Sequence, residues 1–160
     1  MPDYKNCHFR NLLRLDLTEN YFSLLNELSG DKQPITDSII SSCWNKYNAN
    51  MNHHIFVCEE LRDNDFLAHG EIIGTASVLI EHKMLHYGSK VGHIEDVVVS
   101  SKARKRGIGN ILIQKCIDLC KTKRCYKIIL DCSDKNISFY ERCGFKVVEN
   151  CMRINLKYDS

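Results

Sequence analysis

The stretch that decides the fold is residues 97–109, which read Val97-Val98-Val99-Ser100-Ser101-Lys102-Ala103-Arg104-Lys105-Arg106-Gly107-Ile108-Gly109. An apolar run typical of a strand leads into a basic turn with two glycines and then into residues with helical spacing. The first N–H groups of a helix have no partner within the helix and carry the positive end of its dipole. Gly107 and Gly109 lack the Cβ atoms that would keep an anion away from those N–H groups. The stretch therefore predicts a turn that holds a pyrophosphate.

This turn matches neither of the two common phosphate-binding motifs. It is not a P-loop, and it is not the Rossmann pattern Gly-x-Gly-x-x-Gly. Lys102 to Arg106 would also suit a solvated loop or a nuclear-localisation patch. The position between a strand and an amphipathic helix favours the phosphate-binding interpretation.

Outward from the turn, the hydrophobic periodicity predicts an α/β chain of the layered α+β type. Four helices are expected: one capped by Asp16 and carrying Leu17 to Leu28, one from Thr36 to about Tyr47, and helices over about 107–121 and 136–143, the last closed by Gly144. Gly88 marks a turn. The expected strands are about 8–14, 55–59, 71–81, 92–99, 126–131, 145–149 and 151–157.

Composition excludes several classes of protein. The 160 residues suit a single domain, 44% are hydrophobic and 26% are charged, as in an ordinary globular protein. A formal charge of +2 gives no reason to expect nucleic acid as the main partner. No apolar run approaches a membrane span, and the N-terminal residues lack a signal-peptide core, so we expect a cytoplasmic protein. The nine cysteines include no Cys-x-x-Cys pair and are interpreted as buried thiols rather than metal ligands.

A family resemblance adds to this. Arg104-x-x-Gly107-x-Gly109 after Val97–Val99 resembles the acetyl-CoA motif Arg/Gln-x-x-Gly-x-Gly/Ala of the GNAT acyltransferase superfamily. Residues 92–96, 125–132 and 135–145 are similar to glucosamine 6-phosphate N-acetyltransferases, within a resemblance that covers about residues 78–148. It implies a GNAT fold over residues 1–160, with a mixed central sheet of about six or seven strands flanked by four helices. It also implies a homodimer.

The implied reaction passes an acetyl group directly from acetyl-CoA, as co-substrate, to the 2-amino group of D-glucosamine 6-phosphate, toward UDP-N-acetylglucosamine and without a metal. The pantetheine arm would pair with the strand backbone, and an N–H of Val97 or Val98 would serve the oxyanion. The resemblance assigns to the cofactor Val97, Val98, Val99, Arg104, Lys105, Arg106, Gly107, Ile108, Gly109, Asn136 and Tyr140.

The resemblance also implies the reacting groups and the acceptor contacts. The catalytic candidates are Tyr140, as proton donor to the leaving thiolate, and the carboxylates Glu95, Asp96 and Asp131, among which the base is open. Glu95 and Asp96 are adjacent, so they would face opposite sides of a regular strand unless a bulge turns both toward one cleft. The acceptor residues are Ser29, Lys83, Met84, Leu85, His86, Glu95, Asp96, Tyr126, Lys127, Asp131 and Arg153, with Tyr126 and Lys127 reached across a dimer interface.

One position departs from the family pattern. Asn155 stands where the family has an arginine, and Arg153, two residues earlier on the same strand face, would replace it.

Two other functions stay open. The acceptor could be a protein lysine or a polyamine, for which the acidic pair Glu95 and Asp96 is suited, whereas Lys83 and Lys127 favour an anionic acceptor. The chain could also be a silent acyl-CoA-binding module.

Overall fold

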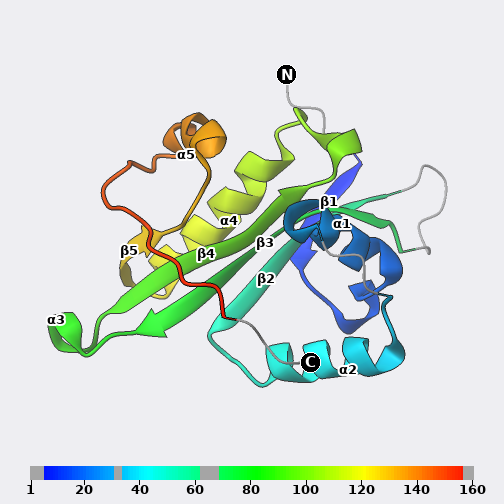
Figure 1. Ribbon diagram of the computed structural model, residues 1–160, viewed down its shortest axis with the longest axis horizontal. Coiled ribbons are helices and arrows are strands. Elements are labelled where there is room, and N and C mark those ends of the chain that lie inside the picture. The colour runs from blue at the N-terminus through cyan, green and yellow to red at the C-terminus, as the bar shows by residue number, and fades with distance from the viewer. Residues whose placement is uncertain (1–5, 31–33, 62–68, 157–160) are drawn as a thin grey trace. The chain divides into compact units, whose positions relative to one another are not determined.

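The central feature of the computed structural model, which describes residues 6–30, 34–61 and 69–156, is a five-stranded mixed sheet (Figure 1). The strands follow the chain order, with β1 to β4 antiparallel and β5 parallel to β4. Their bounds are β1 Cys7–Asn11, β2 His53–Glu60, β3 Glu71–His82, β4 Lys90–Val99 and β5 Cys125–Ile129. The chain divides into two compact units, one up to Leu130 and one from Asp131.

The four expected helices are present. They are α1 Glu19–Ser29, α2 Asp37–Asn48, α4 Ile108–Thr122 and α5 Ile137–Arg142. Thr36 caps α2 as predicted, because its hydroxyl accepts a hydrogen bond from the Ile39 N–H, and Gly144 follows α5 with a left-handed backbone. Asp16 does not cap α1. It ends the short 3₁₀ turn Arg14–Asp16, and Thr18 precedes α1 instead.

The predicted C-terminal strands are wrong. Residues 145–156 form no strand within the described part of the chain, and residue 157 lies outside it, so the sheet has five strands rather than six or seven. The reason is physical: apolar alternation creates a face to bury, but a strand also needs a neighbouring backbone to pair with. The large apolar side chains here are exposed, namely Val147, Val148, Met152, Ile154 and Leu156.

The expected turn at Gly88 contains a short additional helix, α3 Leu85–Gly88. Its residues His86 and Tyr87 have left-handed φ angles of 51° and 58°, so it is an irregular turn rather than a regular helix. It connects β3 to β4 at the tip of their hairpin (Figure 1).

The two faces of the sheet are covered by different helices (Figure 1). On one face, α1 packs into an apolar cluster made of Leu12, Leu17, Tyr21, Leu24, Val57, Ile72 and Val98. On the other face, α4 packs so closely that a Cβ on Gly74 would come within 3.0 Å of Ile108, and a Cβ on Gly92 within 2.3 Å of the Cys120 sulfur. Glycines on β3 and β4 thus set how near α4, and the turn before it, lies to the sheet.

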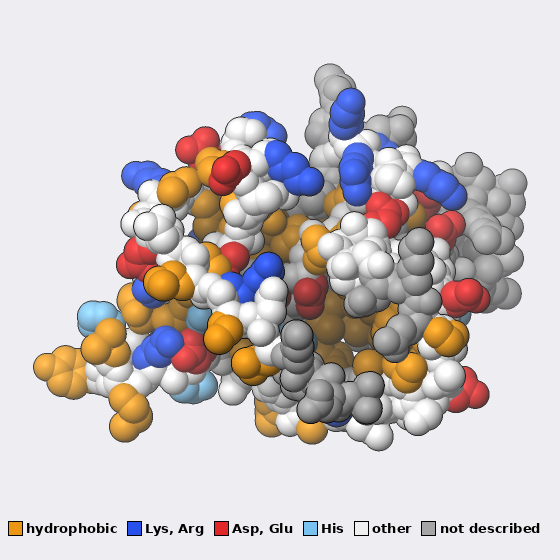
Figure 2. All heavy atoms as spheres, viewed as in Figure 1, with side chains coloured by type: hydrophobic (Ala, Val, Ile, Leu, Met, Phe, Trp, Pro, Cys, Tyr) orange, Lys and Arg blue, Asp and Glu red, His pale blue; other side chains and the backbone are white. Residues whose placement is uncertain are grey.

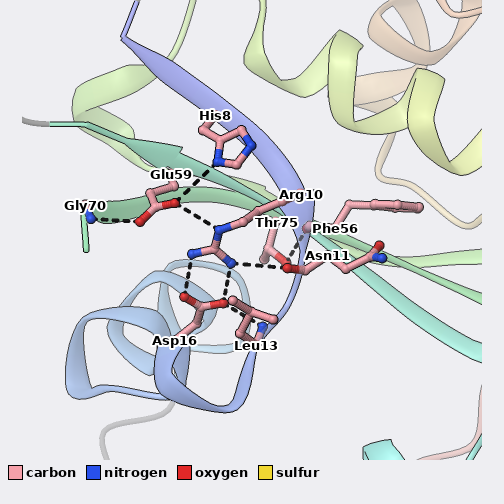
Figure 3. Close-up of polar contacts among 9 residues, drawn as sticks. All are labelled: His8, Arg10, Asn11, Leu13, Asp16, Phe56, Glu59, Gly70 and Thr75. Carbon is pink, nitrogen blue, oxygen red and sulfur yellow. Dashed lines mark hydrogen bonds and ion pairs between the residues drawn. The ribbon is translucent and has the colours of Figure 1, made fainter. Parts of the chain in front are cut away.

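A buried ionic group ties the N-terminal strand to this core (Figure 3). The Arg10 guanidinium bonds both Asp16 oxygens at 2.6 and 2.7 Å and Glu59 at 2.9 Å. Burial by itself would raise the pKa of Glu59, but hydrogen bonds from Arg10 and the Gly70 N–H lower it. Because Asp16 and Glu59 are buried, removal of Arg10 would leave two uncompensated carboxylates.

The cysteines are only partly as expected. All nine are free thiols. Cys58, Cys116 and Cys120 are buried, but the interpretation as buried residues is wrong for Cys43, Cys132 and Cys151, which are exposed.

Candidate active site

A β-bulge distorts β4 at the two adjacent carboxylates. Ser77 of β3 pairs with Glu95, and Thr75 pairs with Val98, so one β3 residue faces Asp96 and Val97 together. Asp96 has a left-handed φ of 50°, and Glu95 and Asp96 are exposed in succession. The bulge that the sequence left as an alternative is therefore present.

The second feature is the separation of β4 from β5. Their parallel pairing runs from Lys90 with Cys125 to His93 with Ile129 and stops there. The strand β4 continues to Val99 and stays paired with β3 on its other side. Within the described strands, the β4–β5 ladder therefore ends before β4 reaches the bulge. This separation of β4 from β5, the splay, begins just before the bulge.

The basic turn follows directly. After the 3₁₀ turn Ser101–Ala103, Lys105 and Gly107 take left-handed φ angles of 66° and 89°, and α4 begins at Ile108. Ile108 is buried and anchors the helix start on the sheet, whereas Lys105 is exposed and Gly109 half-buried. The basic turn thus joins the start of α4 to the end of β4 that lies beyond its ladder with β5.

Two of the four basic side chains of this turn are held by carboxylates. Arg104 lies 3.1 Å from Glu27 of α1, and its Nε donates to the Val99 carbonyl at 3.2 Å. Arg106 lies 2.6 Å from Glu60 of β2. These partners could not be read from the sequence, since they lie 77 and 46 residues away along the chain.

Two residues near Asp96 were also missed from the sequence. Burial raises the pKa of the Tyr21 hydroxyl to about 12, against a hydrogen bond with Thr75, and the negative charge of Asp96 adds to the rise. Burial lowers the pKa of His53, and the charge of Asp96 opposes this. Asp96 therefore lies within electrostatic reach of α1 and β2.

Lys83 follows the last residue of β3 at the β3–β4 tip and is held there by a carboxylate that the sequence did not single out. Its Nζ is 2.5 Å from Oε1 of Glu81, and Nε2 of His93 is 2.7 Å from the other oxygen. The hydrogen bond from Lys83, followed by that from His93, lowers the pKa of Glu81 below its ordinary value. A signal for His93 did exist, because it stands two residues before Glu95 on the same strand.

The other acceptor candidates gather at the β3–β4 tip. The His86 and Tyr126 rings are 4.8 Å apart, and Nζ of Lys127 lies 5.8 Å from the centre of the Tyr126 ring. Met84 and Leu85 are exposed beside them. Figure 2 shows hydrophobic side chains gathered at this tip, at the lower left of the view.

The tip and the bulge lie at opposite ends of β4. Tyr126 follows Cys125, which pairs with Lys90, whereas the bulge is at Asp96. At roughly 3.3 Å per residue, about 20 Å of strand separates them. Within one chain, the structure does not bring Tyr126 and Lys127 to the bulge.

The remaining candidates lie elsewhere. Ser29 is the exposed last residue of α1. In the second unit, Asp131, Asn136 and Arg153 are exposed. Tyr140 of α5 is 9% exposed and lies between the rings of Phe139 and Phe145, at 4.9 and 6.1 Å. Burial raises the pKa of Tyr140 to about 12, with smaller contributions from Cys132 and Cys143, so its hydroxyl is protonated at neutral pH.

The described residues provide neither a metal-binding group nor a membrane-spanning helix. Among residues 6–30, 34–61 and 69–156, no three His, Cys, Asp or Glu side chains are grouped so that they could hold a metal ion. None of the helices in the described parts of the chain combines the length and apolar character needed to cross a membrane.

The chain matches a known protein family over most of its length. The family model described as "Acetyltransferase (GNAT) family" matches residues 16–145, which include the bulge, the splay and the basic turn. The chain belongs to the GNAT acetyltransferase family. GNAT acetyltransferases use acetyl-CoA as co-substrate.

The names of individual relatives of this GNAT chain specify an acetyl acceptor. It is 46% identical over 87 residues to a glucosamine 6-phosphate N-acetyltransferase of Trypanosoma brucei brucei, a match that covers 54% of this chain and 59% of that protein. It is 33% identical over 140 residues to a probable glucosamine 6-phosphate N-acetyltransferase 2 of Oryza sativa subsp. japonica, covering 88% and 82%. The crystal structure of the glucosamine-6-phosphate N-acetyltransferase of Arabidopsis thaliana superimposes with a TM-score of 0.86 at 34% identity, covering 96% of this chain and all of that one.

Proposed function

We propose that this GNAT chain is an enzyme that transfers acetyl from acetyl-CoA to the 2-amino group of D-glucosamine 6-phosphate, producing N-acetyl-D-glucosamine 6-phosphate and CoA. The observation that carries the proposal is the bulged end of β4, which lies beyond the β4–β5 ladder and leads into the glycine turn before α4. The similarity to enzymes of this name in rice and Arabidopsis supports the choice of acceptor. Its product would feed the synthesis of UDP-N-acetylglucosamine.

The cofactor would lie along the open side of β4. The pantetheine amides pair with the backbone of Val97 to Val99, and an N–H of Val97 or Val98 stabilises the oxyanion. The pyrophosphate meets residues 104–109 at the start of α4, which the left-handed backbone of Gly107 supports. Asn136 contacts the pantetheine arm.

Starting from its ammonium form, the acceptor nitrogen loses two protons: one before it attacks and one when the tetrahedral intermediate collapses. Glu95, Asp96 and Asp131 are the carboxylates proposed to orient the amine or take the first of these protons, and the reaction releases one proton to solvent overall. The departing CoA thiolate must gain one, and Tyr140 is the proposed donor. Because burial raises the pKa of Tyr140 to about 12, the phenol carries its proton throughout the physiological range and can donate a hydrogen bond to the sulfur.

The acceptor phosphate would be bound by Lys83 with the neighbouring residues Met84 to His86, by Ser29, and by Arg153 in place of the arginine missing at Asn155. Lys83 to His86, and Tyr126 and Lys127 of β5, all lie at the β3–β4 tip, about 20 Å along the sheet from the bulge of their own chain. This supports a homodimer in which one chain supplies them to the other. A homodimer is also supported by β5, which is an edge strand of the sheet formed by the described residues, and by the exposed apolar residues of 147–156 and of the α3 tip.

We propose one domain for residues 1–160 and a cytoplasmic location. The family match crosses from the first compact unit into the second, which supports a single functional unit. The nine free thiols suit a reducing compartment.

The test measures CoA release from acetyl-CoA with four acceptors: glucosamine 6-phosphate, glucosamine, a lysine peptide and spermidine. We expect turnover with glucosamine 6-phosphate and identification of the N-acetylated sugar phosphate by mass spectrometry. Faster turnover of the peptide or spermidine would assign the chain to a protein-lysine or polyamine acetyltransferase. Acetyl-CoA binding without turnover of any acceptor would indicate a silent binding module.

A further inference from the structure

The carboxylate of Glu27 is bound by the turn that we assign to the cofactor. It accepts hydrogen bonds from the Ser101 N–H at 3.0 Å and from the Arg104 guanidinium at 3.1 Å. Glu27 lies in the last turn of α1, and Ser101 begins the 3₁₀ turn directly after β4. One side chain therefore joins α1 to both ends of the segment 101–104.

Arg104 is held in two directions. While its NH2 group binds Glu27, its Nε donates to the carbonyl of Val99, the last residue of β4. The side chain thus reaches back across the turn to the strand end. Arg106 is engaged in a comparable way by Glu60 of β2, with a 3.5 Å contact from the same guanidinium to the Cys7 sulfur.

These contacts change what the basic residues of the turn can do. A guanidinium that is already bound to a carboxylate adds little net charge for an anion, because the two charges cancel. The same ion pair restricts the backbone between Val99 and Gly107, where left-handed φ angles occur at Lys105 and Gly107. Backbone N–H groups bind a pyrophosphate well only if they are held in one arrangement before it arrives.

We propose that Glu27 is a positioning residue for acetyl-CoA: through Arg104 and Ser101 it holds the turn in the conformation that presents the start of α4 to the pyrophosphate. The inference rests on the proposed function, since it assigns a role within that same cofactor site. Arg104 then acts through the backbone rather than as a direct phosphate ligand. If Arg104 instead bound the phosphate directly, Glu27 would compete with acetyl-CoA, and its removal would strengthen binding.

The sign of the effect separates these two roles. Glu27→Gln keeps the size of the side chain and an acceptor for the Ser101 N–H while it removes the charge. We expect it to weaken acetyl-CoA binding, measured by calorimetry, by about two- to fivefold, the range of one partly exposed ion pair. Arg104→Gln should have a similar effect, and the double variant should bind about as weakly as either single variant. Glu19→Gln, at the other end of α1, is the matched control and should bind like the wild type.

Steady-state kinetics distinguish positioning from general loss of structure. Glu27→Gln should raise KM for acetyl-CoA while kcat, KM for the acceptor and the melting temperature stay close to wild-type values. The exchanged pair Glu27→Arg with Arg104→Glu should recover part of the affinity that Arg104→Glu alone loses.

Unchanged or tighter acetyl-CoA binding by Glu27→Gln, or fully additive effects in the double variant, would overturn the inference. That failure is distinct from failure of the proposed function. In the latter case, the wild type itself would bind no acetyl-CoA or turn over none of the four acceptors.

Discussion

A methyl group added at Gly92 tests how closely α4 is held against the sheet. In Gly92→Ala, the new Cβ would lie 2.3 Å from the Cys120 sulfur and 3.6 Å from a methyl group of Val78. Ordinary contact to a Cβ begins at about 3.4 Å, so the sulfur must move by about 1 Å. Cys120 is only 1% exposed, and α4 and β4 surround it, so it has little room to move.

The expected cost follows from two opposing effects. Overpacking a dense core costs about 1–3 kcal/mol, and the short distance here places Gly92→Ala toward the upper end. Replacing glycine by alanine restricts the unfolded chain and returns about 0.4–1 kcal/mol. The net loss in the free energy of unfolding should be about 2 kcal/mol, which lowers the melting temperature of a chain of this size by about 4–8 °C.

The assay is urea and thermal unfolding followed by circular dichroism, under reducing conditions because all nine cysteines are free. Cys120→Ala removes the clashing sulfur. In the Gly92→Ala background it should restore part of the lost stability, although in the wild type it should cost about 1 kcal/mol through lost packing. A Gly92→Ala protein within about 0.5 kcal/mol of the wild type, or a double variant that shows simple addition of the two losses, would refute the reasoning.

The remaining predictions concern the proposed chemistry. Gly109→Val should obstruct the pyrophosphate, so calorimetry should show weaker CoA binding in a folded protein with unchanged sugar binding; equal CoA affinity would remove Gly109 from the cofactor site. Glucosamine should be a poorer acceptor than its 6-phosphate by at least about 100-fold in kcat/KM, because charged groups such as Lys83 and Lys127 lose their phosphate partner; comparable values would contradict this. Tyr140→Phe should lower kcat by about 10²–10⁴ with little change in acetyl-CoA affinity, and an acyl donor with a more acidic thiol should reduce the deficit; near-normal kcat would make Tyr140 a packing residue. Because the pKa of Tyr140 is raised to about 12, the stability that its protonated hydroxyl contributes is present below about pH 10 and lost as the pH rises through 12. Any fall in kcat that begins below about pH 10 should therefore come from another group and persist in Tyr140→Phe. The disappearance of that fall in Tyr140→Phe would contradict this.

The elements of the fold were predictable where their signals are local. Helical spacing, the Thr36 cap and the Gly144 stop depend on residues a few positions apart, and each is confirmed. The basic turn before α4 was also visible, because strand, glycines and helix follow one another along the chain. The bulge at Asp96 was an open alternative, since it is defined only by the pairing of β4 with β3.

The strands expected over 145–149 and 151–157 show the limit of such patterns. Alternation within a segment predicts which side chains share a face, but a strand forms only where another backbone supplies hydrogen bonds. Distances along the sheet also depend on pairing: the register of β4 and β5 puts Tyr126 about 20 Å from Asp96 within one chain, which the order of residues in the sequence does not show.

By itself, the sequence determined the family, the order of elements and the turn that we assign to the cofactor, because these are written in contiguous residues. Only the tertiary structure decided the partners of the charged side chains: Glu27 with Arg104, Glu60 with Arg106, and Glu81 with Lys83 and His93. An ion pair depends on the distance between two groups in space, and the sheet register and helix packing that set this distance join residues up to 77 positions apart.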